Sequence, residues 1–246
     1  MLAILIFIIG LIIGSFLNVC IYRIPREESI VFPPSHCPNC KLNLKWKDLI
    51  PLISYAVLRG RCRYCKARIS PVYPFIEFLN AFLYLLIYFK YGLSLEFIKF
   101  AFLTSLVIVI GVIDYFTTDI YTNTIIVGLI VGIAFAIISF FVEGSIMIYI
   151  IGSLIGGGVI SLIILLTNGM GWGDAELLFI IGLFLGVRLT LVTLFLSFII
   201  GGIVGGVLII LKIKSRKDYI PFGPFISIGA VISILFGEFI INKLLF

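Results

Sequence analysis

Two aspartates lie at the ends of long apolar runs, where a carboxylate is unusual. Asp114 follows the apolar stretch 100–113, and Asp174 closes the glycine-rich segment Gly169-Met-Gly-Trp-Gly-Asp174. An ionisable side chain in or near membrane hydrocarbon is costly, so by default it marks a functional site. If the two carboxylates face each other from helix ends, they are expected to share proton chemistry.

Asp174 also has a purely structural interpretation, because aspartate is a favoured N-cap residue of a helix. The same explanation does not apply to Asp114. That residue lies near the C-terminus of its predicted helix, where the helix dipole disfavours a negative charge. We therefore predict that the pair is functional.

Four of the five cysteines form two CxxC pairs, Cys37–Cys40 and Cys62–Cys65. Two such pairs at this separation predict a four-thiolate structural zinc site. The alternative is two disulfides, which would require an oxidising compartment. The basic residues around the pairs favour the reducing cytoplasm, and hence zinc. Cys20 is interpreted as a buried apolar residue, and His36 as an ordinary loop histidine.

The composition excludes a soluble domain. The chain has 246 residues, of which 62% are hydrophobic and 12% charged, and its mean hydropathy is +1.27. A membrane span requires about 20 mostly apolar residues, and the chain supplies about eight such runs. We therefore expect an all-α polytopic membrane protein. The first run has no early basic residue and no small-residue cleavage site, so it predicts a retained helix rather than a signal peptide.

The apolar runs predict eight transmembrane helices joined by polar or glycine-rich turns. Their approximate bounds are 2–22, 74–88, 95–116, 124–142, 146–166, 174–188, 189–211 and 224–244. The expected organisation is a first helix (1–22), a cytoplasmic cysteine loop (23–73) and a seven-helix membrane core (74–246). The loop has too little apolar mass for a core of its own, so metal binding is expected to supply much of its folding free energy.

The basic residues predict the orientation in the membrane. Residues 23–70 and 212–217 hold fourteen of the eighteen lysines and arginines, and such residues mark the cytoplasmic side. This accounts for the high pI without a nucleic-acid partner. Eight helices place both basic loops on one side, whereas seven would separate them. The eight-helix count also puts Asp114, Asp119 and Asp174 near the cytoplasmic face.

A set of short motifs runs from the first predicted helix through at least the sixth. It comprises Gly14-Ser-Phe-Leu-Asn-Val19, Ile21-Tyr-Arg23-Ile-Pro25, Cys37-Pro-Asn-Cys40, Asp48-Leu-Ile-Pro-Leu-Ile-Ser54, Leu58-Arg-Gly-Arg-Cys-Arg-Tyr-Cys65, Ile69-Ser-Pro-Val-Tyr-Pro-Phe-Ile-Glu77 and Gly171-Trp-Gly-Asp174. In this order the set resembles the type 4 prepilin peptidases, which are bifunctional leader peptidase/N-methyltransferases. The last motif is similar to their GxGD motif, which other intramembrane aspartyl proteases such as presenilins share.

This resemblance implies two activities. One is cleavage of the basic leader of prepilins or pseudopilins at the cytoplasmic face of the plasma (inner) membrane, as part of type IV pilus assembly or type II secretion. The other is methylation of the new N-terminal residue, commonly Phe, with S-adenosylmethionine. Carried over by position, the proteolytic pair falls on Asp114 and Asp174. Asp119 is a rival for the first aspartate, but the spacing favours Asp114, and we interpret Asp119 as a turn or N-cap residue.

The chain departs from the family pattern at two places. Members usually have a hydrophobic-Pro-Asp or hydrophobic-Pro-Asn turn after the first aspartate, where this chain has Ile120-Tyr-Thr-Asn123. Many have a lysine two places after the GxGD aspartate, where this chain has Glu176. Both changes leave the aspartate pair intact and bear on substrate preference.

The methyl-transfer site is less evident from the residues. No GxG-type nucleotide loop follows a strand, so the cofactor site is expected to be atypical. By resemblance, the machinery involves the cytoplasmic loop and nearby helix ends. The candidates for cofactor binding are Glu77 and the turn Arg59-Gly60-Arg61. Their structural alternatives are a helix cap for Glu77 and the binding of anionic lipid by the arginines.

Two other classes of function remain open. Asp114 and Asp174 could form the proton relay of a membrane transporter, although no convincing internal repeat supports this class. A non-enzymatic pilus-assembly protein whose zinc loop docks onto other components would not need Asp114 at all.

Overall fold

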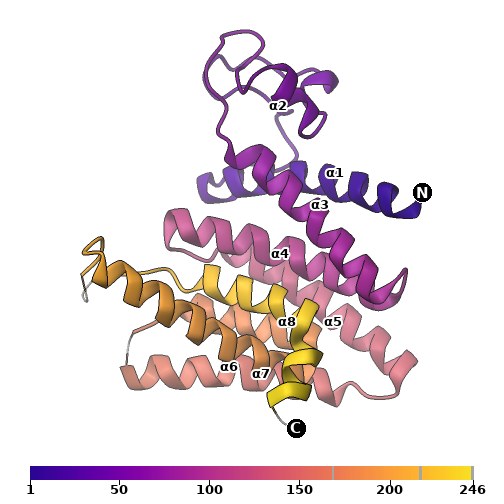
Figure 1. Ribbon diagram of the computed structural model, residues 1–246, viewed down its shortest axis with the longest axis vertical. Coiled ribbons are helices and arrows are strands. Elements are labelled where there is room, and N and C mark those ends of the chain that lie inside the picture. Colours follow the sequence, from indigo (N-terminus) through magenta and orange to yellow (C-terminus); the bar gives the residue numbers. More distant parts are fainter. Residues whose placement is uncertain (168, 216–217, 245–246) are drawn as a thin grey trace. The chain divides into compact units, whose positions relative to one another are not determined.

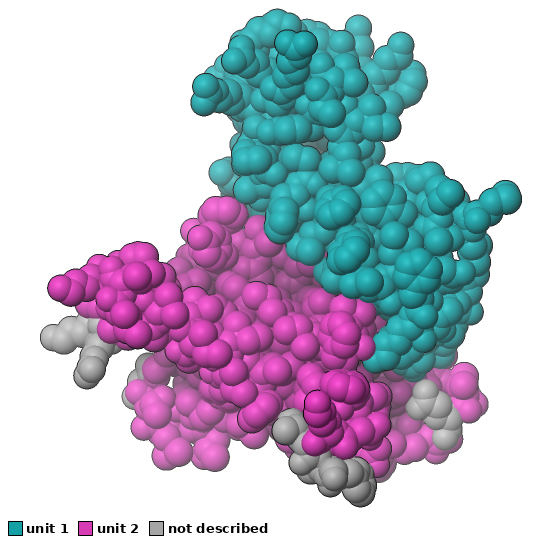
Figure 2. All heavy atoms as spheres, in the orientation of Figure 1, with its two compact units in different colours: residues 1–97 teal, residues 98–246 magenta. Residues whose placement is uncertain are grey.

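The computed structural model describes residues 1–167, 169–215 and 218–244 of the chain (Figure 1). Within these ranges the protein is helical and has no strand, only two isolated β-bridges in the cysteine loop. The prediction of an all-α fold is confirmed. The chain divides into two compact units, residues 1–97 and residues 98–246 (Figure 2).

The first unit consists of two long helices and the cysteine loop that connects them. The long helices are α1 (Leu2–Arg23) and α3 (Val72–Tyr91). The loop contains two short 3-10 helices, η1 (Ile24–Arg26) and η2 (Trp46–Asp48), and the five-residue helix α2 (Ile53–Val57).

Glycines let α1 and α3 pack backbone to backbone. A Cβ atom placed on Gly10 would lie 2.6 Å from Cα of Ala81, and one on Gly14 would lie 2.7 Å from Cα of Glu77. One turn further along α1, the amide of Asn18 donates to a backbone carbonyl of the first turn of α3 at 3.0 Å. Small residues allow such close approach, which favours helix association in lipid. This packing explains why the motif at residues 14–19 contains Gly14 and Asn18.

Arg23 ends α1 and organises the loop that follows. It is only 5% exposed, and its guanidinium donates to the carbonyls of Ser29 and Pro33, both at 2.8 Å. A buried guanidinium is stable only when its donors are bonded. Arg23 therefore ties the start of the cysteine loop to the end of the helix.

The second unit is built from long helices. They are α4 (Leu95–Thr117), α5 (Thr122–Glu143), α6 (Met147–Thr167), α7 (Trp172–Ile210) and α8 (Gly223–Leu244). The first of them, α4, begins in the first unit and is mostly buried along the rest of its length.

The longest helix, α7, reverses direction at Gly186. That residue has φ 68° and ψ −177°, which is not helical. A Cβ atom on Gly156 of α6 would lie 2.5 Å from the carbonyl oxygen of Leu178 and 3.1 Å from Cγ2 of Thr190. In a straight helix, Leu178 and Thr190 would be roughly 18 Å apart along the axis. Both can contact one residue only because the chain folds back, and glycine tolerates the positive φ at the turn.

The helix count follows from this reversal. Seven helices in the described residues are long and apolar enough to cross a membrane, with α7 counted as one. Because α7 contains both the sixth and the seventh predicted segments, the eight predicted segments are all present. Their observed bounds differ from the predicted ones by only a few residues. Arg216 and Lys217 of the second basic loop lie outside the described residues.

Two glycines in α6 provide a matched test of the packing against α7. We expect Gly156→Leu to destabilise the protein by about 1–3 kcal/mol, because its side chain would collide with the backbone of α7. Gly158→Leu should change stability by less than about 0.5 kcal/mol, since a Cβ atom there meets nothing within 4 Å. Denaturant unfolding in mixed micelles measures both. Equal stability of the two variants would contradict this packing.

Candidate functional site

Asp114 is buried in the last turn of α4 and is held by the start of α8. It is 2% exposed, and its Oδ2 accepts a hydrogen bond from the N–H of Gly223 at 2.8 Å. The positive end of the α8 dipole thus offsets the unfavourable C-terminal end of α4. A Cβ atom on Gly223 would lie 2.5 Å from the same oxygen, so this approach requires glycine.

Asp174 is buried in the first turn of α7, where the helix dipole favours a carboxylate. It is 3% exposed. Its Oδ2 accepts the N–H of Gly171 at 3.3 Å, and its own N–H donates to the Gly171 carbonyl at 3.1 Å. A Cβ atom on Gly173 would lie 2.8 Å from Cβ of Ile120. Glycine at this position therefore admits the α4–α5 connection against the start of α7.

The two carboxylates interact electrostatically with each other and with Tyr219, which precedes α8. Burial raises the pKa of Tyr219, and the carboxylates of Asp174 and Asp114 raise it further, with a smaller contribution from Asp119. The Tyr219 hydroxyl and Asp174 Oδ2 lie 3.8 Å and 3.9 Å from the position that a Cβ atom would take on Gly171. Tyr219 is therefore protonated at neutral pH, and its hydroxyl and the Asp174 carboxylate both border the space beside Gly171.

Asp119, the rival for the first aspartate, has a different environment. It lies in the connection between α4 and α5 and is exposed to solvent. An exposed carboxylate interacts weakly with its neighbours because water screens it. Burial therefore favours Asp114 over Asp119 as the partner of Asp174.

The four cysteines of the CxxC pairs are brought together in the first unit. Their Sγ atoms all lie within 4.8 Å of one another, and those of Cys37 and Cys65 are 3.8 Å apart. Tetrahedral zinc with bonds of about 2.3 Å to sulfur has its ligands about 3.8 Å apart. All five cysteines are free of disulfides. The cluster therefore fits one structural zinc ion, as predicted.

The two CxxC pairs fold into the same kind of turn. In each, the residue after the second cysteine donates its N–H to the carbonyl of the first, from Lys41 to Cys37 at 2.8 Å and from Lys66 to Cys62 at 3.1 Å. Lys41 and Lys66 have φ of 60° and 61°. The repeated turn directs both sulfur atoms of a pair toward the same point.

Two polar contacts hold the second pair. The amide of Asn39 donates to Sγ of Cys65 at 3.5 Å. This bond is the largest of several contributions that together lower the pKa of Cys65, which favours the thiolate, the form that binds metal. Arg63 forms an ion pair with Asp48 at 2.7 Å, which links the pair to η2.

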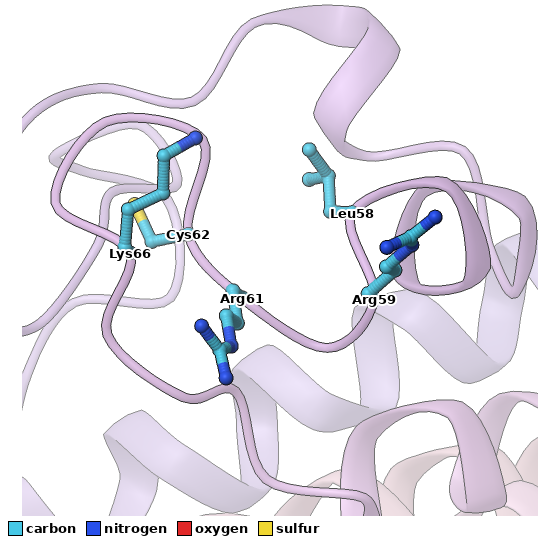
Figure 3. Close-up of a pocket in the computed structure, with 5 residues that line it drawn as sticks. All are labelled: Leu58, Arg59, Arg61, Cys62 and Lys66. Atoms are coloured by element: carbon cyan, nitrogen blue, oxygen red, sulfur yellow. The ribbon is translucent and has the colours of Figure 1, made fainter.

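The residues suggested for cofactor binding line two different cavities. Glu77 is 8% exposed, accepts the N–H of Leu52 at 2.9 Å, and lines a cavity of about 510 Å³. Arg59 and Arg61 line a second, neighbouring cavity of about 340 Å³, which shares Leu58 and Cys62 with the first. Their side chains point away from each other there (Figure 3). Gly60, between them, has φ +65° and forms the turn.

Comparison with known proteins covers both units. The profile of the Bacterial Peptidase A24 N-terminal domain matches residues 8–91, and that of the Type IV leader peptidase family matches residues 101–206. The prepilin leader peptidase/N-methyltransferase of Bacillus subtilis (strain 168) is 33% identical over 239 residues, which are 97% of this chain and 96% of the relative. The chain belongs to the prepilin leader peptidase/N-methyltransferase family. The resemblance seen in the motifs is thereby confirmed.

Other members of the family are similar over most of their length. The protein of the same name from Pseudomonas putida is 31% identical, covering 94% of this chain and 89% of the relative. The one from Aeromonas hydrophila is 32% identical, covering 95% and 90%. None of the solved structures matches the chain.

Gly223 and Tyr219 interact with the aspartates, but no sequence motif singles them out. A signal was present, since Pro221-Phe-Gly-Pro224 places a glycine between two prolines directly before an apolar run. Proline near the first position of a helix marks a helix start. Nothing in the sequence, however, indicates that this start contacts a residue 109 positions earlier.

The cysteine cluster predicts about one zinc ion per chain in the purified protein. Cys62→Ser should lose most of the metal and expose residues 23–70 to proteolysis, because metal binding and folding are coupled in so small a domain. Cys20→Ser is the matched control, since Cys20 lies in α1 outside the cluster, and it should keep both metal and protease resistance. Elemental analysis and limited proteolysis measure these outcomes. A metal-free wild type with a protease-resistant loop would contradict the structural role of zinc.

Proposed function

We propose that this chain cleaves the leader peptide of type IV prepilins or pseudopilins and methylates the new N-terminal residue with S-adenosylmethionine. The names of its relatives support both activities. One observation carries the assignment of the peptidase site. Asp114 and Asp174 are both buried at helix ends in the same unit, and they interact with each other.

Two neighbouring carboxylates suit peptide hydrolysis. They cannot both ionise cheaply, so the pair holds one proton between them. The ionised member takes a proton from the attacking water, and the neutral member polarises the scissile carbonyl and later protonates the leaving amine. The proton belongs to the pair as a unit rather than to one named aspartate.

The backbone around the pair supports this chemistry. Each carboxylate accepts one main-chain N–H, from Gly223 for Asp114 and from Gly171 for Asp174, and these bonds fix the orientation of the reacting oxygens. Gly171 has an extended conformation that any residue can adopt. Its role is therefore spatial, because a side chain there would lie beside the Asp174 carboxylate and narrow the approach of a substrate.

We propose that this site lies at the cytoplasmic face of the inner membrane. The loop at 23–70 is basic, which favours a cytoplasmic location. Because α7 reverses at Gly186, it counts as two membrane crossings. With that count, the end of α4 and the starts of α7 and α8 are expected on the cytoplasmic side.

A transporter using the same aspartates is a weaker alternative. A proton relay across a membrane is expected to have ionisable groups near the middle of the bilayer. Asp114 instead lies in the last turn of its helix and Asp174 in the first. Their place at helix ends favours contact with a substrate that arrives from the aqueous side.

Removal of either buried carboxylate should abolish cleavage. We expect Asp114→Asn and Asp174→Asn to lower the rate by at least about 10³-fold, because each removes half of a proton-transfer unit. Asp119→Asn is the matched control and should retain most activity, since Asp119 is exposed. Purified variants in detergent, assayed with a prepilin by mass spectrometry of the released leader, give these rates. Full cleavage by Asp114→Asn, or loss in Asp119→Asn alone, would reassign the first aspartate.

A side chain at position 223 should lower the rate of cleavage, because Gly223 contacts the Asp114 carboxylate through its backbone N–H. In Gly223→Ala the new methyl group would displace the Asp114 carboxylate, and a misplacement of about 1 Å can lower the rate by about 10²-fold. Gly202→Ala in α7 is the control, because a Cβ atom there meets nothing within 4 Å. The same cleavage assay with both variants tests the contact, and equal rates would remove Gly223 from the site.

A further inference from the structure

The cavity of about 510 Å³ in the first unit has the features of a small-molecule site. Sites of this kind have volumes of about 300–1,000 Å³ and mostly apolar walls with a few polar groups. This cavity lies between one face of α1, the start of α3 and the cysteine loop. Its walls include the aromatic rings of Tyr22, Tyr55 and Tyr73 and the carboxylate of Glu77.

The charges around this cavity are largely paired. The guanidinium of Arg23 is bonded to loop carbonyls, and that of Arg63 is paired with Asp48. Arg68 is exposed and lines the same cavity. The lining of the cavity therefore includes a buried carboxylate, an exposed guanidinium and several aromatic rings.

These groups match S-adenosylmethionine. Its adenine can stack on a tyrosine ring, and its sulfonium cation is attracted by aromatic faces and by the Glu77 carboxylate. Its own carboxylate can pair with Arg68. The cavity of about 340 Å³ fits less well, because Arg59, Arg61 and Lys66 line it and would repel a ligand with a net positive charge.

We infer that the cavity lined by Glu77 binds S-adenosylmethionine and that Glu77 takes the proton which the substrate amine must lose. The inference rests on the proposed methyltransferase activity. It assigns the cofactor to one cavity and moves Arg59 and Arg61 out of the cofactor site.

Methylation of the substrate amine requires one proton transfer, from the amine to Glu77. The new N-terminus arrives as an ammonium group and must give up one proton to have a free lone pair, and the Glu77 carboxylate accepts it. The amine nitrogen then forms a bond to the methyl carbon while the carbon–sulfur bond breaks. The bonding electrons stay on sulfur, which becomes the neutral thioether of S-adenosylhomocysteine. The nitrogen becomes a methylammonium, and the proton on Glu77 passes to water.

Glu77 also makes a hydrogen bond that supports the cysteine loop, so a variant that tests its role in proton transfer must keep this bond. Its Oε2 accepts the N–H of Leu52, directly before α2. Glu77→Gln keeps one oxygen that can accept this N–H and nearly the same side-chain shape. It removes the charge and the basicity, and it replaces the other oxygen with an NH2 donor. The variant therefore separates proton transfer from support of the loop.

The cavity itself is tested by filling it. Ser54 and Ala56 both lie in α2, but only Ser54 lines the cavity, and Ala56 is exposed. With zinc-loaded full-length protein, Ser54→Trp should weaken binding of S-adenosylhomocysteine in equilibrium dialysis by at least about tenfold and reduce methyl transfer. Ala56→Trp should bind like the wild type. Both variants should keep zinc and leader cleavage. Should Ser54→Trp lose zinc, Val19→Phe fills the same cavity from α1.

Glu77→Gln should bind S-adenosylhomocysteine within about twofold of the wild type and cleave normally, while its kcat for methylation falls by about 10²–10⁴-fold. Methylation at the wild-type rate would remove Glu77 as the proton acceptor. Wild-type affinity in cavity-filled variants that keep zinc would overturn the cavity assignment, although the activity itself would stand. A wild type that neither cleaves nor methylates would instead refute the proposed function.

Discussion

Two buried carboxylates, each bonded to one backbone N–H of a glycine, are the constraint on which the second unit depends. Asp174 gains support from its place in the first turn of α7, where the helix dipole is favourable. Asp114 lies at the unfavourable end of α4, so another helix start must compensate. The N–H of Gly223 supplies this compensation at 2.8 Å, which makes α8 part of the site although it carries neither aspartate.

Close packing of helix backbones explains why glycine is so frequent in this chain. Lipid gives little hydrophobic drive for helices to associate, so close packing of backbones has to replace it. Gly10 and Gly14 serve this purpose between α1 and α3, and Gly156 serves it between α6 and α7.

The cysteine loop is stabilised differently, because it has few apolar side chains to bury. There the four sulfur atoms can bind one metal ion, whose affinity becomes folding free energy.

The sequence predicted the helices well because each apolar run is long and ends in a turn signal. It also separated the two halves of α7, since the Gly186-Val-Arg188 segment interrupts the apolar run. The importance of Asp114 and Asp174, which the structure buries at helix ends, and the clustering of the four cysteines could be inferred because these residue types are rare in such surroundings. The partners of Asp114 were not, because a backbone N–H from Gly223 leaves no mark on local composition. The motifs suggest Glu77 and the Arg59–Arg61 turn together for cofactor binding, whereas in the structure these residues line two neighbouring cavities.

The central claim is that Asp114 and Asp174 act as one unit, and a double-variant cycle on prepilin cleavage tests it most directly. Residues of one catalytic unit have strongly non-additive effects, because removal of either already disables the pair. We expect the residual cleavage rate of Asp114→Asn/Asp174→Asn to equal that of the slower single variant. If the two single effects instead multiply in the double variant, the aspartates act independently and the shared-proton account is wrong.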